Sequence, residues 1–167
     1  NVKRMLAYSS ISHAGFILLG VQAASPEGTA AVLFYVGTYA AIVAGTFGII
    51  TIVAGSRDAR TTIDDYQGLS TRRPVLALAF TVLLLAQAGV PLTAGFFAKF
   101  EVVLAAVDAH SYWLAVVAML TAVISAFVYL RVVVAMYMVD GDEGVEDGAE
   151  APPKEPVPWT AGVGIGL

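Results

Sequence analysis

Long apolar runs are the feature of this sequence that most restricts its fold. Four of them, over residues 5–24, 30–54, 75–107 and 112–139, reach or exceed the length of about 20 residues that a helix needs to cross a bilayer. Their apolar residues are continuous rather than alternating, and they are too long for strands. A fifth run begins near residue 157 and is cut short by the end of the chain. The pattern predicts an all-α, polytopic transmembrane helix bundle.

The composition supports an integral membrane protein. Of the 167 residues, 58% are hydrophobic and 13% are charged, and the mean hydropathy is +0.79. Soluble domains carry about 25% charged residues. Without a basic stripe, a nucleic-acid partner is not expected. The chain has no cysteine, metal-ligand cluster or phosphate-binding glycine loop, so we expect this chain itself to hold no metal or cofactor.

The basic residues predict how the bundle is oriented. Lys3 and Arg4 precede the first run, arginines fill the connection between the second and third runs, and Lys154 follows the fourth. The opposite connections, SPEG and DAHS, contain neither lysine nor arginine. The positive-inside rule makes the basic side cytoplasmic. Residues 140–156 are acidic and rich in glycine and proline, which favours a flexible, solvated loop over a partner-binding tail.

The third run is too long for one straight helix and contains helix-breaking residues near its middle. Pro91 removes a backbone donor, and Gly89 and Gly95 are expected to add backbone freedom. These residues predict a break into two half-helices near 89–95. A broken backbone at membrane depth is tolerated only inside protein or beside a wet cavity, and it marks ion and substrate sites in transporters.

A lysine lies just after this break. Inserting Lys99 into a membrane costs about 3 kcal/mol, so a partner should compensate for the charge or a function should use it. Glu101 lies two positions away, which on a helix points it about 200° from Lys99. We therefore expect the partner of Lys99 to be a carboxylate from another helix.

The first run carries the second group of polar residues. Ser9 and His13 are four residues apart and share a helix face, and Ser12 lies beside His13. For His13 alone, a structural hydrogen bond to a neighbouring helix would be favoured. Lys99 in the same small bundle changes that balance, because ionisable groups inside a membrane are functional by default. We predict a proton relay through Lys99, His13, Ser9, Ser12 and water.

The second run is rich in small and aromatic residues. Gly37, Gly45 and Gly48 occur at spacings that let helices approach closely. Tyr35 and Tyr39 share a face and could contact the relay, but a structural role is favoured for both. This helix is therefore expected to pack rather than to take part in chemistry.

Three segments resemble one known family. They are NVKRMLAYSSISHAGF, DDYQGLSTRRPVLALAFTVLLLAQAGVPLTAGFFAKF and LRVVVAMYM. They are similar to the antiporter-like membrane subunits of the proton-pumping NADH–quinone oxidoreductase, respiratory complex I. Three related subunits differ in the charged residue of the broken helix, and Lys99 followed by Phe100 resembles one of them. The resemblance implies that residues 1–167 are a C-terminal part, with the tenth to thirteenth of fourteen helices and the start of the last.

The resemblance also implies roles. Lys99 would be the last lysine of a proton channel and exchange protons with the non-cytoplasmic side, and His13 would pass protons toward it. Quinone reduction elsewhere would drive the movement, with NADH, flavin, iron–sulfur clusters and quinone bound by other subunits. The implied partners are other membrane subunits, the lipid bilayer of the bacterial plasma membrane and protons. Glu101 departs from the family pattern, which has a neutral residue there.

Two alternatives remain open at this point. One is a subunit of a cation/proton antiporter or of a hydrogenase-linked relative, which shares the same helical module. Such relatives more often resemble the type in which an acidic residue follows the lysine. The other is a structural membrane anchor without a proton path, for which Lys99 and His13 would tolerate apolar replacement.

Overall fold

A computed structural model describes residues 1–55 and 62–138, and these form an all-α bundle with no strand among them. The elements are α1 (Val2–Gln22), α2 (Pro26–Ala54), the short 3-10 helix η1 (Asp64–Tyr66), α3 (Leu69–Arg72), α4 (Pro74–Ala88), α5 (Ala94–Asp108) and α6 (Tyr112–Met138). Among the described residues α1, α2 and α6 are long and apolar enough to cross a membrane. The predicted fold class is confirmed.

Some sequence features fall outside this description. Arg57, Arg60, Lys154, the predicted loop at 140–156 and the run from 157 onward lie outside the described residues. Of the loop residues that predict the orientation, the structure describes Lys3, Arg4, Arg72 and Arg73.

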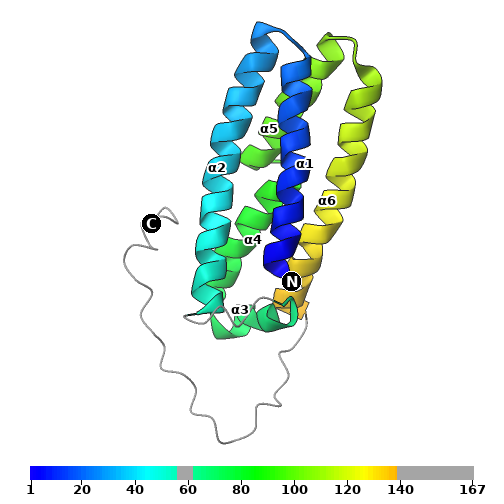
Figure 1. The fold of residues 1–167 in the computed structure, drawn as a ribbon. Coiled ribbons are helices and arrows are strands. Elements are labelled where there is room, and N and C mark those ends of the chain that lie inside the picture. Colours follow the sequence, from blue (N-terminus) through cyan, green and yellow to red (C-terminus); the bar gives the residue numbers. More distant parts are fainter. Residues whose placement is uncertain (56–61, 139–167) are drawn as a thin grey trace, which may run out of the picture.

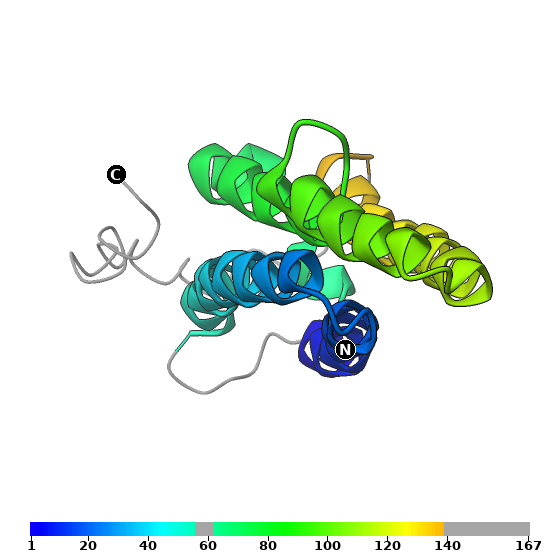
Figure 2. The ribbon, with the colours of Figure 1, turned by 90° about the horizontal axis from the view of Figure 1, so that it is seen from above.

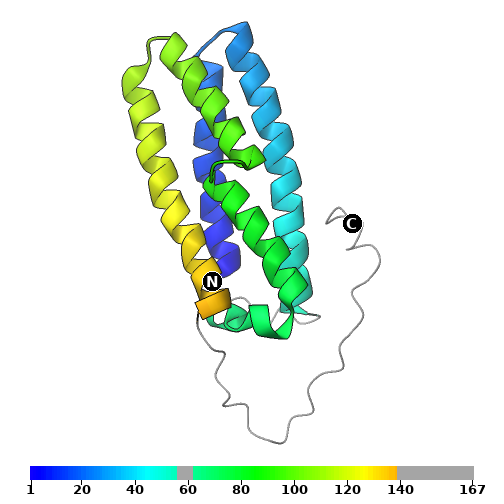
Figure 3. The same ribbon diagram turned by 180° about the vertical axis from the view of Figure 1, so that it is seen from behind.

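α4 and α5 together take the place of one membrane-crossing helix. They follow one another along one side of the bundle and are separated by a short loop at its middle (Figures 1 and 3). α2 and α6 each pack against both half-helices, and α1 packs against α2, α5 and α6. Viewed from the end, the two half-helices and α6 lie across from α1 and α2 (Figure 2). The loop therefore lies level with the middle of the long helices.

Capping residues set the helix boundaries at the turn between α1 and α2. Ser25 is the N-cap of α2, and its hydroxyl oxygen accepts a hydrogen bond from the Gly28 N–H at 3.0 Å. Pro26 occupies the first helical position, where its missing N–H is not needed. α2 consequently begins four residues before the boundary expected from the apolar run at residue 30.

The bundle buries two of its ionisable residues and leaves many of its large apolar residues exposed. Leu33 and Phe127 are 70% and 71% exposed, whereas His13 and Lys99 are 5% and 8% exposed. A soluble bundle would show the reverse distribution. An apolar surface around a few interior polar groups is what a lipid environment requires, because water is absent from the outer surface and polar groups gather on the bundle interior.

The buried polar residues lie between two apolar clusters. One cluster contains Leu6, Ile49 and Phe80, and the other contains Phe16, Ala31 and Val102. His13 lies between the residues that α1 contributes to the two clusters, and Lys99 lies on α5 just after the break. The site is thus enclosed on both sides by packed apolar side chains.

The charged residues mark the two ends of the bundle. Lys3 and Arg4 begin α1, and Arg72 and Arg73 precede α4, at the end where α3 lies (Figure 1). The turns at the opposite end, at 23–25 and 109–111, contain no lysine or arginine. Arg131 is exposed in the final turns of α6, toward the basic end. This distribution agrees with a cytoplasmic basic end, which stays a prediction.

Candidate functional site

The break begins with a glycine that closes the end of α4. Gly89 adopts φ +83°, a conformation that L side chains rarely adopt. Its N–H donates to the Leu85 and Ala86 carbonyl oxygens at 3.0 and 3.1 Å, and the Val90 N–H donates to the Leu85 carbonyl oxygen at 3.1 Å. This arrangement ends the helix and leaves the Gln87 and Ala88 carbonyl groups without helical partners.

Thr93 starts the second half-helix. Its hydroxyl oxygen accepts from the Phe96 N–H at 3.3 Å and donates to the Val90 carbonyl oxygen at 2.7 Å. Pro91 lies in the exposed loop between the halves. One hydroxyl therefore both caps α5 and closes the loop behind it.

Gly95 contributes to the break in a different way from the predicted one. It lies within α5 and has no left-handed backbone angle, so the expectation of added backbone freedom is wrong there. A Cβ at this position would lie 1.8 Å from the Ala86 carbonyl oxygen. The glycine is required because the first turn of α5 touches the backbone of the last turn of α4.

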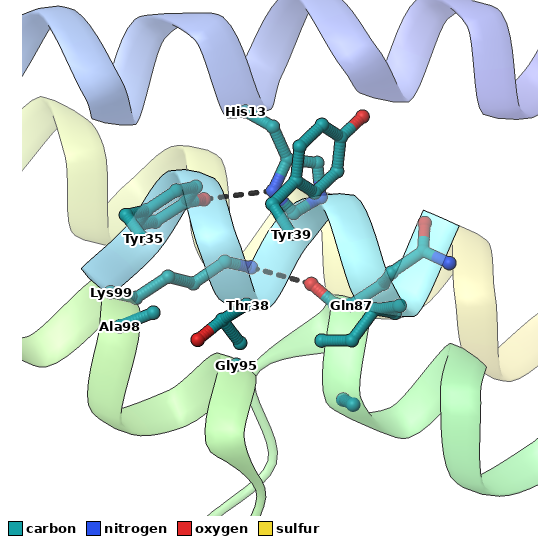
Figure 4. Close-up of a pocket in the computed structure, with 10 residues that line it drawn as sticks. His13, Tyr35, Thr38, Tyr39, Gln87, Gly95, Ala98 and Lys99 are labelled. Atoms are coloured by element: carbon teal, nitrogen blue, oxygen red, sulfur yellow. Dashed lines mark hydrogen bonds between the residues drawn. The ribbon is translucent and has the colours of Figure 1, made fainter. Parts of the chain in front are cut away.

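Lys99 binds the free carbonyl end of α4. Its Nζ donates to the carbonyl oxygen of Gln87 at 2.7 Å (Figure 4) and to that of Ala88 at 3.0 Å. Nζ also lies 5.3 Å from the centre of the Phe16 ring. The C-terminal end of a helix carries partial negative charge, which stabilises an ammonium group.

The expected carboxylate partner of Lys99 is not found among the described residues. Within residues 1–55 and 62–138, no carboxylate forms an ion pair with Lys99, and Glu101 is exposed on another side of α5. The helix break itself supplies the partner, because it exposes two carbonyl oxygens within reach of the Lys99 side chain on α5. These two carbonyl oxygens stabilise an ammonium group that no acid within residues 1–55 and 62–138 neutralises.

Gln87 connects the carbonyl end of α4 to α2. Its Nε2 donates to the Thr46 hydroxyl oxygen at 2.7 Å, and the Thr46 hydroxyl donates to the Ile42 carbonyl oxygen at 2.8 Å. Sequence reasoning missed Gln87, although a lone amide in an apolar run directly before the break was a usable signal. Its side chain fixes the backbone whose carbonyl holds Lys99.

Replacing Thr46 with valine should destabilise the bundle by about 1–3 kcal/mol, the cost of leaving a buried amide without a partner. Thermal unfolding of the full-length subunit in detergent measures this. Thr51→Val is the matched control, because Thr51 lies on the same helix, makes the same bond to the carbonyl four residues back, and is exposed. Equal midpoints for the two variants would show that the amide bond contributes nothing.

Both ring nitrogens of His13 meet tyrosine hydroxyls. Nδ1 lies 2.8 Å from the Tyr35 hydroxyl oxygen, and Nε2 lies 3.2 Å from that of Tyr129. The Tyr39 ring stacks on the imidazole with centroids 4.3 Å apart and an interplanar angle of 21°. Figure 4 shows Tyr35 and Tyr39 on α2 facing His13. Tyr35 and Tyr39, for which the sequence favoured a structural role, thus contact His13 directly. The sequence analysis did not single out Tyr129.

The two predicted serines occupy different positions. Ser9 makes a short hydrogen bond to the Tyr129 hydroxyl, which joins it to His13. Ser12 instead lies 3.5 Å from the Ser125 hydroxyl oxygen of α6. The structure therefore places Ser9 next to the histidine group and Ser12 on a separate contact between α1 and α6.

A small cavity lies between His13 and Lys99. Its volume is about 10 Å³, which is close to the minimum for one water molecule. Polar side chains line it from four helices, namely His13, Tyr35, Thr38, Tyr39, Gln87 and Lys99 (Figure 4). No hydrogen bond joins His13 directly to Lys99 in the described part of the chain. The surface of the cavity itself is apolar, although residues of both polar groups line it.

The chain is an apolar-surfaced membrane-type bundle with a buried lysine, a buried histidine and a broken helix, the features that mark ion and substrate sites in membrane proteins. The family model for the transmembrane region of NADH:quinone oxidoreductase/Mrp antiporter proteins matches residues 1–125. The chain belongs to this family.

Individual relatives show which type of subunit within the family this chain resembles. The chain is 44% identical over 150 residues to "NADH-quinone oxidoreductase subunit N 1" of Solibacter usitatus, covering 90% of this chain and 31% of that protein. It is 51% identical over 142 residues to a subunit N 1 of Sorangium cellulosum, covering 83% and 28%. The chain thus spans about a third of the length of these relatives. The predicted resemblance to antiporter-like complex I subunits is confirmed.

A solved structure supports the same assignment. Respiratory complex I from Thermus thermophilus, with bound Aureothin, contains a chain that is 28% identical to this one with a TM-score of 0.75. The match covers 98% of this chain and 35% of that chain. The fold is therefore shared with part of a complex I subunit.

Proposed function

We propose that this chain is part of a subunit N of a bacterial NADH–quinone oxidoreductase and that Lys99 carries protons through it. The observation that carries the proposal is the position of Lys99, buried at a helix break and separated from His13 by a cavity about 10 Å³ in volume. A lysine in such a place is costly to insert and is expected to have a use.

The proposed route runs from His13 to Lys99 and then along α5. A water in the cavity takes a proton from the His13 group and gives it to a neutral Lys99. The resemblance to complex I subunits implies that Lys99 releases its proton toward the end that lacks lysine and arginine, where α5 ends at Asp108. Ser9 would pass protons to His13. Ser12 is also predicted to belong to the route.

The driving force would come from other parts of the complex. Quinone reduction changes charges along the membrane arm, and those charges alter the proton affinity of Lys99. NADH, flavin, iron–sulfur clusters and quinone would be held by other subunits, so this chain would take part in the enzyme without redox chemistry of its own. Its partners would be neighbouring membrane subunits and the lipid of the bacterial plasma membrane, which it would cross several times.

A second candidate is supported by the family description, which also includes Mrp antiporters. In that case Lys99 would exchange protons for a cation without any link to quinone. The relatives named NADH-quinone oxidoreductase subunit N, at 44% and 51% identity, favour the first candidate.

Replacing Lys99 with methionine in the full-length subunit tests the proposal. NADH-driven quinone reduction and proton uptake are measured together in inverted membrane vesicles that contain the assembled complex. We expect proton uptake to fall to less than about a tenth, because positioned proton-transfer groups accelerate such steps by about 100-fold or more. Methionine keeps the length and apolar stem of the side chain, so packing is largely preserved.

Arg131→Met is the matched control, because Arg131 is an exposed cation near the end of α6. It should leave both rates unchanged. Normal uptake in Lys99→Met would contradict the proposal and favour the structural anchor. Sodium-dependent uptake without NADH would favour the antiporter.

A further inference from the structure

One buried hydroxyl of the site comes from a helix to which the proposed route gives no role. Tyr129 of α6 is 1% exposed, and its hydroxyl oxygen contacts both Ser9 Oγ and His13 Nε2. We propose that Tyr129 is a proton-relay residue that joins Ser9 to His13 in a directional hydrogen-bond chain and sets which ring nitrogen of His13 bears the proton. The inference rests on the proposed proton-carrying function.

The contacts define a chain of four groups. Ser9 bonds to Tyr129, Tyr129 to His13 Nε2, and His13 Nδ1 to Tyr35, whose side chain lines the cavity beside Lys99. The groups come from α1, α6 and α2, so the chain crosses the bundle between helices. It therefore connects Ser9 on α1 with the cavity at the broken helix.

The hydrogens in this chain must all point the same way. Neutral imidazole has one donor and one acceptor nitrogen, and each hydroxyl has one hydrogen. If His13 donates from Nδ1 to Tyr35, then Nε2 accepts from Tyr129, and Tyr129 accepts from Ser9. If Tyr129 donates to Ser9 instead, then Nε2 donates to Tyr129 and Nδ1 accepts from Tyr35. The direction at Tyr129 thus selects the tautomer of His13.

Passage of one proton reverses the chain without leaving a charge. Ser9 gains a proton from outside and gives its own to Tyr129, which passes its own to Nε2. His13 releases the Nδ1 proton to Tyr35, and Tyr35 releases its original proton into the cavity. At each step one bond to hydrogen forms and one breaks. One proton enters at Ser9, one leaves at Tyr35, and the second arrangement replaces the first.

The neighbouring hydroxyls are engaged elsewhere. The Tyr39 hydroxyl donates to Ser10 Oγ at 2.9 Å, while its ring face covers the imidazole. Ser12 lies against Ser125. Among the described residues, Tyr129 is the side chain that bonds to Nε2, so removing its hydroxyl interrupts the chain at one defined point.

Tyr129→Phe in the full-length subunit tests the inference, because it removes one oxygen and keeps the ring. Proton uptake and quinone reduction are measured in vesicles with the assembled complex, in H2O and in D2O. We expect uptake to slow by about 100-fold, as for loss of a positioned proton-transfer group, and the solvent isotope effect to increase. A purely structural role would lower the amount of assembled complex and leave the isotope effect unchanged.

Tyr137→Phe is the matched control, because Tyr137 lies on the same helix and is 46% exposed. It should behave as the unaltered protein. If Lys99→Met blocks uptake while Tyr129→Phe leaves uptake and isotope effect normal, this inference fails and the proposed function stands. If Lys99→Met has no effect, the proposed function itself fails.

If the complex that carries Tyr129→Phe does not assemble, Ser9→Ala tests the same hydrogen-bond chain. It removes the other end of the same hydrogen bond with a smaller change in volume. Slower uptake with a larger isotope effect supports the chain, whereas unaltered uptake overturns it.

Discussion

Replacing Gly95 with alanine is expected to push apart the two halves of the broken helix and to destabilise the bundle by at least about 3 kcal/mol. The added Cβ would lie 1.8 Å from the Ala86 carbonyl oxygen and 2.7 Å from its carbonyl carbon. Overpacking a well-packed interior costs about 1–3 kcal/mol where side chains can yield, and here the obstacle is backbone. The separation would also carry Lys99 away from the Gln87 and Ala88 carbonyl groups.

Thermal unfolding of the full-length subunit in detergent measures the loss. Gly37→Ala is the matched control, because Gly37 is a helical glycine of α2 whose added Cβ would meet nothing within 4 Å. Alanine is a better helix former than glycine, so the control should be neutral or slightly stabilised. A Gly95→Ala variant as stable as the Gly37→Ala variant would show that α4 and α5 do not touch at Ala86.

Replacing His13 with asparagine is expected to abolish proton uptake and to cost about 1–3 kcal/mol of stability. Asparagine does not titrate and is too short to meet both tyrosines. Tyr129 keeps its bond to Ser9, whereas the Tyr35 hydroxyl loses its bond to Nδ1 in a buried site. An unpaired buried hydroxyl accounts for the expected cost in free energy of unfolding.

The same two measurements, uptake in vesicles and unfolding in detergent, check this prediction. His110→Asn is the matched control, because His110 is exposed in the turn between α5 and α6 and adopts φ +57°, which asparagine tolerates. Wild-type uptake in the His13→Asn variant would remove the histidine from the route.

Much of the architecture follows from local sequence patterns. The apolar runs predict the membrane-crossing helices because each helix needs a fixed length to cross a bilayer. The break was predictable because Gly89 and Pro91 act on their own backbone, and Lys99 was singled out because an ammonium group in an apolar run is costly. The start of α2 at Pro26 was also readable, from Ser25 and the proline that follows it.

The partners within the site could not be predicted from the sequence. The spacing in the sequence argued against Glu101 as the partner of Lys99. The actual partners are two backbone carbonyl oxygens, which every residue type has, so the sequence could not indicate them. Tyr129 reaches His13 from 116 residues away, so its role depends on how helices pack rather than on any local pattern. Gly95 was recognised as special, yet the reason lay in its distance from Ala86 and not in its own backbone.

The carbonyl oxygens that hold Lys99 differ from a carboxylate in one respect that matters for the proposed role of Lys99 as a proton carrier. They have no titratable proton of their own, so they cannot compete with Lys99 for the proton that it carries. When Lys99 gives up its proton, a carboxylate partner would be left as an isolated anion in the membrane, whereas a pair of amide carbonyls stays neutral. The broken helix thus stabilises the ammonium group with neutral dipoles, so in the proposed role Lys99 would bind and release a proton without leaving an unpaired anion behind.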